Sequence, residues 1–327
     1  MKVSVPLPGG LSLDIGEEPA GGPEPTGGAE PAGTEDQQGR RLPKAYPTRR
    51  LPKGLLLLDG GEPLAEEGVG FGVPILKRGV QTIFPGSVEV ASRQDGPVWE
   101  VTAAYDMRLV ERLAKPGGGG DAAGGSAAGG AAGGSAAGGE LVRSRLLYAA
   151  KDSLAALHRR FPRLRGPLTA ASLALRRRFG WVTTYEEAGF RATVPVTYAI
   201  REGNGAAGDE PARLTVAVDM AGLAGRGVTE VVLMNEQGAR HFDCYEDSDG
   251  AVLRGREIGT WDKVTAERAA FVSRAHRVSF SLGQAEGATL HRGTELVGSR
   301  LAWAGFGYSL RPERKTFSYE LRIETVS

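Results

Sequence analysis

The sequence predicts a mainly β protein, an antiparallel β-sandwich, with one α-helical hairpin inserted between two β-rich regions. Short runs rich in Val, Ile, Thr and aromatic residues recur along the chain, and Gly, Pro or Asp-Gly pairs separate them. Residues 141–179 differ, because their apolar residues recur at helical spacing. The 327 residues, 41% of them hydrophobic, suffice for one large domain or two ordinary domains.

Charge and cysteine content exclude several classes of function. The 40 basic and 39 acidic residues nearly balance, so the composition gives no overall reason to expect nucleic-acid binding. The only cysteine, Cys244, excludes an intramolecular disulfide and a multi-cysteine metal site, and it fits a reducing compartment. The sequence shows neither a secretory signal pattern nor an apolar run of about 18 residues. We therefore expect a cytoplasmic protein that needs no cofactor and no metal.

Residues 1–53 are expected to form a flexible N-terminal arm. Apolar residues alternate on both sides of Pro-Gly-Gly at 8–10, which is compatible with a short hairpin or with edge strands. Residues 16–38 then carry only acidic charges, and residues 40–53 carry only basic ones. Such an arm is either an interaction tail or a solvated linker, and we favour the linker because it needs no partner.

Residues 54–115 are expected to form a first β segment, with the strand-like runs GLLLLD, VPILKRGVQTIF, SVEVASR and VWEVTAAYDMRLV. Within it, Gly68, Gly70 and Gly72 stand at every second position. A dinucleotide-binding fingerprint would need G-x-G-x-x-G followed by a helix, whereas Pro74 follows here. We interpret the glycines structurally, because a side-chain-free face allows a close backbone approach or a bulge.

Residues 116–140 are mostly Gly and Ala and are expected to be a tether. Residues 141–180 are expected to form the inserted helical hairpin, in which two amphipathic helices meet near Pro162. Ten Lys or Arg and a single acid, Asp152, make residues 141–179 strongly basic.

Seven arginines of this hairpin could face a partner: Arg159, Arg160, Arg163, Arg165, Arg176, Arg177 and Arg178. Nucleic-acid phosphates, an anionic membrane surface and a protein are the alternatives. Because the acidic residues at 17–36 offer an internal partner, we favour a structural or protein-contact role, then the periphery of a membrane, and place nucleic acid last.

Residues 181–327 are expected to form the main β domain, with about ten short strands. In the last run Phe317, Tyr319 and Leu321 alternate strictly with polar residues. The run AERAAFVSRAH from Ala266 is either a strand or a short helix. Because isolated pairs or trios of strands are marginally stable, we expect the strands before the tether to join the sheets of those after it.

This arrangement resembles the β-supersandwich of galactose-mutarotase-like proteins. The resemblance is one of architecture. It implies large antiparallel sheets that face each other and a sugar bound on a concave side, and it assigns a role to none of the residues of this chain.

The densest polar cluster is NEQGARHFDCYEDSDG, residues 235–250. An EF-hand calcium loop does not fit, because alignment on Asp247 and Asp249 puts Tyr245 first and Arg256 last. Asp-Gly between two strand-like runs predicts a β-hairpin instead.

The candidate catalytic residues are His241, Asp243 and Glu236. If the run from Arg240 is a strand, His241 and Asp243 share one face, where an imidazole and a carboxylate could exchange protons with a ligand. Glu236 is the alternative partner of His241. The reaction expected is acid–base work on a sugar, such as epimerisation or bond cleavage.

The candidate ligand-binding residues are Arg240, Trp261 and Asp262. A tryptophan ring can face the C–H surface of a sugar while a neighbouring carboxylate accepts its hydroxyls. The alternative is that His241 and Trp261 are ordinary sheet residues, and His276 stands isolated in strand-like sequence.

The sequence thus predicts a protein that binds a carbohydrate or similar polar ligand on a β-sandwich, with acid–base catalysis as an option. The competing prediction is a non-catalytic scaffold that docks through its basic helical hairpin to a protein partner or an anionic membrane surface.

Overall fold

The computed structural model describes residues 2–16, 51–65, 68–79, 81–115, 140–141, 182–201, 211–297 and 300–326. This part of the chain is mainly β, and its sheets are antiparallel, as predicted. Its helices are single 3₁₀ turns: η1 (Pro8–Gly10), η4 (Ala221–Leu223) and η5 (Gly255–Ile258). The tether and the basic helical hairpin lie outside the described residues, apart from residues 140–141. None of the described helices has the length and apolar character needed to cross a membrane.

The chain divides into two compact units, one formed by residues 1–109 with 188–327 and the other by residues 110–187. In the second unit, the structure describes the end of β7 (Val98–Lys115), the start of β9 (Val182–Arg201) and β8 (Glu140–Leu141). There β8 pairs antiparallel with β7. The candidate functional residues described below all belong to the first unit.

A small antiparallel sheet of the first unit has the strand order β1-β2-β3-β4. Its strands are β1 (Val3–Pro6), β2 (Leu11–Ile15), β3 (Leu56–Asp59) and β4 (Glu62–Pro63). Val5, Leu13 and Leu57 are fully buried, so alternation puts one face of this sheet into a core. The hairpin expected around Pro-Gly-Gly is confirmed. Residues 3–15 are thus part of a sheet, although the sequence assigns residues 1–53 to a flexible arm.

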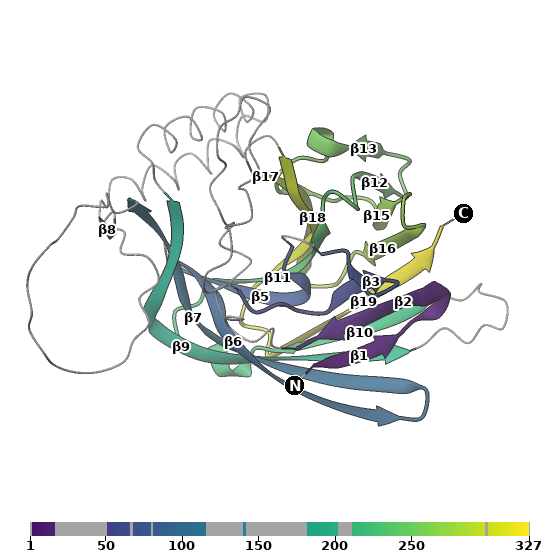
Figure 1. The fold of residues 1–327 in the computed structure, drawn as a ribbon. Helices are drawn as coiled ribbons and strands as arrows, with labels where there is room; N and C mark the ends of the chain where they lie inside the picture. The colour runs from purple at the N-terminus through teal and green to yellow at the C-terminus, as the bar shows by residue number, and fades with distance from the viewer. Residues whose placement is uncertain are drawn as a thin grey trace, which may run out of the picture. The chain divides into compact units, whose positions relative to one another are not determined.

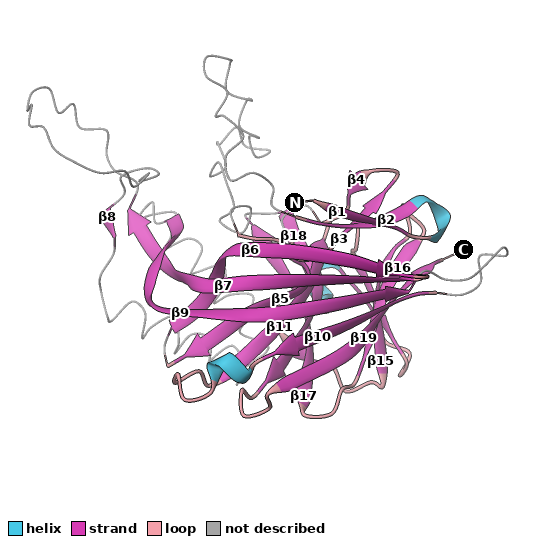
Figure 2. Ribbon diagram, turned by 90° about the horizontal axis from the view of Figure 1, so that it is seen from below, coloured by secondary structure: helices cyan, strands magenta, loops and turns pink. Residues whose placement is uncertain are grey.

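Fifteen strands of the described chain join a second, larger sheet, drawn in Figures 1 and 2. Its order is β13-β12-β15-β16-β19-β10-β9-β7-β6-β5-β11-β18-β17-β14, with β8 beside β7. The strands not yet given are β5 (Gly70–Arg78), β6 (Gln81–Asp95), β10 (Ala212–Asp219), β11 (Glu230–Gly238), β12 (Cys244–Asp247), β13 (Val252–Arg254), β14 (Asp262–Lys263), β15 (Arg268–Ser273), β16 (Val278–Gly283), β17 (Ala288–Val297), β18 (Arg300–Leu310) and β19 (Thr316–Thr325).

The pairing of β5 with β11 confirms that strands before and after the tether share one sheet. The strict alternation of the last run is also confirmed, since β19 buries every second residue up to Ile323. The ambiguous run from Ala266 is a strand, because β15 pairs on both sides, with β12 and β16. The run VPILKRGVQTIF is two strands, since the chain reverses at Gly79 and Arg78 pairs with Gln81.

Two halves of the large sheet pack face to face through aromatic side chains. The ring of Phe71 on β5 lies 5.2 Å from that of Phe280 on β16, in an edge-to-face contact. Tyr308 on β18 lies 4.8 Å from Tyr319 on β19, measured between ring centroids. These strands are far apart in the strand order, so the contacts cross the core between two layers. This packing supports the predicted β-sandwich.

A β-bulge at Gly72 interrupts the ladder between β5 and β11. Val73 pairs with Met234 and Phe71 with Asn235, so Gly72 is an extra residue without a partner in the ladder. Its φ of +78° favours glycine. An added Cβ would lie 2.7 Å from the ring of Tyr198. The structural interpretation of the alternating glycines, a bulge with close backbone approach, is therefore confirmed.

Side chains satisfy the backbone groups that the bulge removes from the ladder. The Gly72 amide donates to Oδ1 of Asn235 at 3.2 Å. The hydroxyl of Tyr198 donates to the Phe71 carbonyl at 3.0 Å. Oδ1 of Asn235 also accepts the hydroxyl of Tyr319 at 2.7 Å, which ties β11 to the opposite layer.

We predict that Gly72→Ala destabilises the protein much more than Gly225→Ala. Both glycines have positive φ, +78° and +71°, so both variants carry the left-handed penalty of about 1–2 kcal/mol. The alanine at position 72 would also collide with Tyr198, and such overpacking costs about 1–3 kcal/mol. The alanine at position 225 avoids this cost, because nothing lies within 4 Å of an added Cβ there. Urea denaturation of both variants measures the difference, and equal midpoints would contradict the described bulge.

Candidate functional site

Buried polar residues gather at the C-terminal end of β11. Of the nine buried polar or charged residues in the described chain, four lie within residues 235–241: Asn235, Glu236, Gln237 and His241. This strand is paired on both sides, with β5 and β18, so such positions ordinarily hold apolar side chains. Burying polar groups costs free energy unless they are hydrogen-bonded. Asn235 serves the bulge, and the other three need a different explanation.

His241 lies in a tight turn directly after β11. The amides of His241 and Phe242 both donate to the Gly238 carbonyl, each at 3.0 Å. The turn directs His241 inward, where it is only 9% exposed. Its Nδ1 lies 2.8 Å from Nε2 of His276, which belongs to the turn between β15 and β16. The two imidazole rings meet edge to face at 4.7 Å.

A carboxylate completes this chain of contacts. Oδ2 of Asp59, the last residue of β3, lies 2.8 Å from Nδ1 of His276. The side chains of His276 and Asp59 are 18% and 35% exposed, so exposure increases from His241 toward Asp59. We call this hydrogen-bonded series the Asp59–His276–His241 relay.

The proton positions in the relay follow from the donor and acceptor inventory. An ionised Asp59 only accepts, so Nδ1 of His276 carries a proton. Nε2 of a neutral His276 then accepts from Nδ1–H of His241, which leaves Nε2 of His241 as the basic nitrogen. If the two imidazoles bind one additional proton, the hydrogen bond between them persists and the positive charge faces Asp59 through the series. If both imidazoles are protonated, Nδ1–H of His241 meets Nε2–H of His276 and the hydrogen bond between them is lost.

The turn that holds His276 is conformationally strained. Arg277, the next residue, has a φ of +51°, and it is the one non-glycine residue with positive φ in the described chain. The left-handed conformation costs a residue with a Cβ about 1–2 kcal/mol. The Arg277 carbonyl accepts the Val326 amide at 2.8 Å, and the Ser273 hydroxyl accepts the His276 amide at 3.4 Å. These contacts fix the backbone on both sides of the imidazole.

Glu236 and the relay lie beneath the same covering segment, which the structure describes at residues 51–65 and 68–69. Oε2 of the buried Glu236 accepts the Val69 amide at 3.3 Å. The Leu64 carbonyl accepts the Gly238 amide at 2.8 Å, and the same segment supplies Asp59. A carboxylate and two imidazoles therefore stand at one covered end of β11.

Gln237 is the third buried polar residue at this end. It is fully buried, and neither Nε2 nor Oε1 has a hydrogen-bond partner among the described protein groups. An unsatisfied buried polar group costs about 1–3 kcal/mol. Stability alone does not explain such a residue in the middle of a sheet.

The structure separates the residues that the sequence places together with His241. The strand expected from Arg240 begins only at Cys244, because the turn after Gly238 takes up the intervening residues. The alternation that was to put His241 and Asp243 on one face is therefore wrong. Asp243 is exposed, whereas His241 is buried. Arg240 is exposed as well.

The hairpin predicted in the same cluster is confirmed. Strands β12 and β13 pair antiparallel on either side of Ser248–Ala251. Oδ1 of Asp247 accepts the amides of Asp249 and Ala251, at 3.1 and 3.0 Å. Gly250 supplies the positive φ, +86°, that the turn requires. The carboxylate of Asp247 therefore stabilises the turn.

Trp261 and Asp262 have their described partners on β17 and β18. The Trp261 ring stacks on His291 at 5.0 Å with an interplanar angle of 9°. It also lies against the Cα of Gly307, where a Cβ would collide with it. Asp262 begins β14 and pairs with Arg292. The prediction that Trp261 and Asp262 bind a ligand stays a prediction.

Sequence reasoning missed His276 and Asp59. They are 217 residues apart, and neither belongs to a local sequence motif. Asp59 ends a leucine-rich run, and His276 stands between Ala275 and Arg277 in the turn after β15. Only the packing of β3 against the turn between β15 and β16 brings them together. No pattern within a short window could have shown this pair.

Comparison with protein-family models, with curated proteins and with solved structures gives no match in any of the three. In the described part of the chain, no three His, Cys, Asp or Glu side chains converge so as to hold a metal ion.

We predict that His291 makes stability depend on pH. Burial lowers the pKa of His291 below its usual value of about 6.5. The unfolded chain then binds the proton first, so stability is full above pH ~6.5 and declines as the pH falls below that value. His291→Gln should reduce the loss of stability between pH 7.5 and pH 5, measured by urea denaturation at both pH values. An unchanged loss would show that His291 is not responsible.

Proposed function

We propose that this protein binds a polar ligand of the carbohydrate class and moves a proton to or from it through His241, with His276 and Asp59 as positioning residues. The observation that carries the proposal is the pair of 2.8 Å hydrogen bonds that joins the three side chains in one series.

The relay has the chemical properties that a general base requires. A carboxylate holds one imidazole in a single tautomer, and that imidazole in turn orients the next. When His241 takes up a proton at Nε2, the positive charge is stabilised through His276 by Asp59. Because His241 is buried, this stabilisation acts in surroundings of low dielectric constant and is stronger than it would be in water.

Glu236 is the proposed second proton-transferring group. Acid–base chemistry on a sugar generally uses two groups with separate roles, and Glu236 lies under the same covering segment as the relay. Asp243 is the alternative that the sequence favours, and its exposed position makes it the weaker candidate.

The carbohydrate class is supported by the polar character of the site and by its sheets. Carboxylate, imidazole and amide groups are hydrogen-bonding partners suited to hydroxyls. The two facing layers agree with the architecture of galactose-mutarotase-like proteins, and a supersandwich with a sugar on its concave side remains part of the proposal. Trp261, Asp262 and Arg240 are the proposed accessory ligand contacts.

The competing proposal, a scaffold that docks to a protein or to an anionic membrane through residues 141–180, concerns residues outside the described part. The helical hairpin and its seven arginines, Arg159 to Arg178, stay predictions. Docking of this kind would leave the relay without a role.

The proposed chemistry is tested by incubating the purified chain in D₂O with a panel of hexoses, uronic acids and oligosaccharides. NMR then follows deuterium incorporation and the release of reducing ends. We expect His241→Gln to lower the rate about 10²-fold or more, since it removes the transferring group. His276→Gln and Asp59→Asn should lower the rate less and shift its pH profile, because they change the basicity of His241.

The matched control is Asp243→Asn, which changes an exposed carboxylate two residues from His241 in the sequence. It should retain the wild-type rate. Loss of activity in Asp243→Asn together with full activity in His276→Gln would support the pair chosen from the sequence and overturn the relay. Absence of any turnover or binding across the panel would contradict the proposed function itself.

A further inference from the structure

Three arginines stand side by side on the outer face of the large sheet. Arg322 on β19 pairs directly with Arg213 on β10, and Arg213 pairs directly with Arg201 on β9. Alternation puts all three on the side away from the core, since their neighbours Leu321, Leu214 and Ile200 are buried. We call these three residues the arginine row.

The arginine row is open to solvent and only partly neutralised. Arg213 and Arg201 are exposed, and in the described part of the chain Arg213 has no ion pair. Nε of Arg322 donates to Glu320 at 2.6 Å, which leaves its two terminal nitrogens for another partner. Glu320 and Glu324 flank Arg322 on the same face of β19. No acid of these strands lies directly opposite Arg213, because its partners are Arg322 and Arg201.

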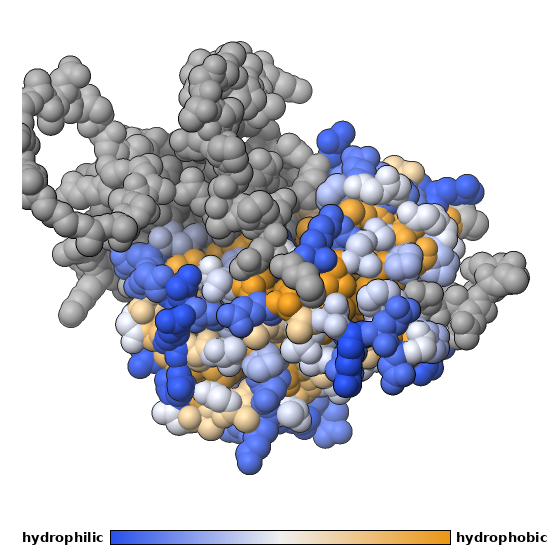
Figure 3. All heavy atoms as spheres, turned by 60° about the horizontal axis from the view of Figure 1, so that its bottom comes forward, coloured by the Kyte–Doolittle hydropathy of each residue, from blue (hydrophilic) through white to orange (hydrophobic). Residues whose placement is uncertain are grey.

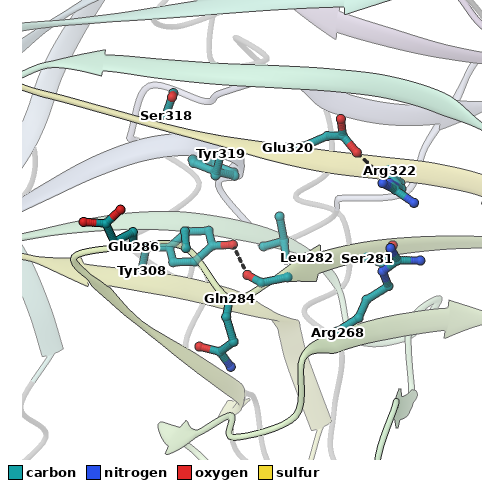
Figure 4. A pocket seen from close by; sticks show the side chains of 12 residues that line it. Arg268, Ser281, Leu282, Gln284, Glu286, Tyr308, Ser318, Tyr319, Glu320 and Arg322 are labelled. Carbon is teal, nitrogen blue, oxygen red and sulfur yellow. Dashed lines mark hydrogen bonds and ion pairs between the residues drawn. The ribbon is translucent and has the colours of Figure 1, made fainter.

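A polar pocket of about 340 Å³ opens at the β19 end of the row. Figure 4 shows Arg268 and Ser281 close together on one side of it and the ion pair of Glu320 with Arg322 on the other. Ser281 pairs with Arg322 in the sheet, so the pocket continues the arginine row onto β16. The hydroxyl of Tyr308, deeper in the pocket, donates to the Gly283 carbonyl.

Such an arrangement is unfavourable without a counter-charge. Like charges directly opposite each other on neighbouring strands destabilise a sheet, and here two such pairs share one residue. Strands lie about 4.8 Å apart, so the row spans about 10 Å between its outer Cα atoms. Guanidinium groups bind phosphate-type oxygens with two parallel hydrogen bonds each. A ligand with two or more anionic groups along this span would match the row.

We infer that this face binds a small soluble polyanion that carries at least two phosphate- or sulfate-type groups, with Arg213 at the centre of the site. A compact ligand can bind Arg213 and Arg201 away from the acids at the pocket, Glu320 and Glu286, whereas a broad anionic surface would also meet these acids and be repelled by them. The site is separate from the relay, because the pocket lies at the C-terminal end of β16 and His276 precedes its N-terminal end.

Large hydrophobic side chains of the described chain are almost all buried or half-buried. In the view of Figure 3, hydrophilic side chains are spread over the described surface, with hydrophobic residues visible between them. Within the described chain, Val252 is the one large hydrophobic residue that is exposed, and it lies on β13, away from β9 and β10 in the strand order.

The test measures binding of inorganic tripolyphosphate, of a persulfated disaccharide and of inorganic monophosphate to the full chain by calorimetry, at two salt concentrations. We expect saturable binding of at least one of the two polyanions, weaker at the higher salt concentration, and much weaker binding of monophosphate. Arg213→Gln should weaken polyanion binding about tenfold or more, because it removes a charged hydrogen-bonding group. The better of the two ligands shows whether phosphate or sulfate groups are preferred.

The control variant is Arg311→Gln, which removes an equally exposed arginine outside the row. It should bind like the wild type. Without ligand, Arg213→Gln should be at least as stable as the wild type, since the variant relieves repulsion between like charges. Equal weakening of polyanion binding in both variants would show only a general effect of charge and would overturn the assignment. Absence of saturable binding, or association with phosphatidylserine vesicles alone, would overturn the assignment.

Discussion

The hydrogen bond from the Gly72 amide to the Asn235 side chain ties the bulge of β5 to the interior of the sandwich. One oxygen, Oδ1 of Asn235, accepts from this amide and from Tyr319 in the opposite layer. Burial raises the pKa of Tyr198 and of Tyr319, so both hydroxyls keep their protons and act as donors, Tyr198 to the Phe71 carbonyl and Tyr319 to the Asn235 side chain. The Phe71 carbonyl and the Gly72 amide are thus satisfied, so the layers can pack through aromatic rings at the bulge.

The same strand leads from this structural network to the proposed site. The hydrogen bonds of Asn235 explain its burial, whereas Glu236, Gln237 and His241 lie at or just after the end of β11 that the covering segment, residues 51–65 and 68–69, contacts. A strained turn at Arg277 and a strand end at Asp59 are needed to complete the relay. Three separate parts of the chain therefore converge at His241, and the unsatisfied amide of Gln237 lies four residues before it in the sequence.

Much of the fold could be predicted because its signals are local. The alternation of β19, the Asp-Gly turn at Gly250 and the glycines of β5 each follow from a period or from a conformational requirement of a few residues. The candidate site could be predicted only in part. The sequence points to His241 and Glu236 because polar residues crowd their short segment, whereas Asp59 and His276 are joined by packing over 217 positions. It points to Asp243 because strand alternation is expected at residues where the chain instead turns.

The most direct test of the relay is ¹⁵N NMR of the imidazole nitrogens in histidine-labelled protein at neutral pH. The described contacts predict that His241 and His276 are both protonated at Nδ1 and unprotonated at Nε2. A neutral His276 or His241 protonated at Nε2 instead of Nδ1 would contradict the hydrogen-bonded series and with it the proposed role of His241.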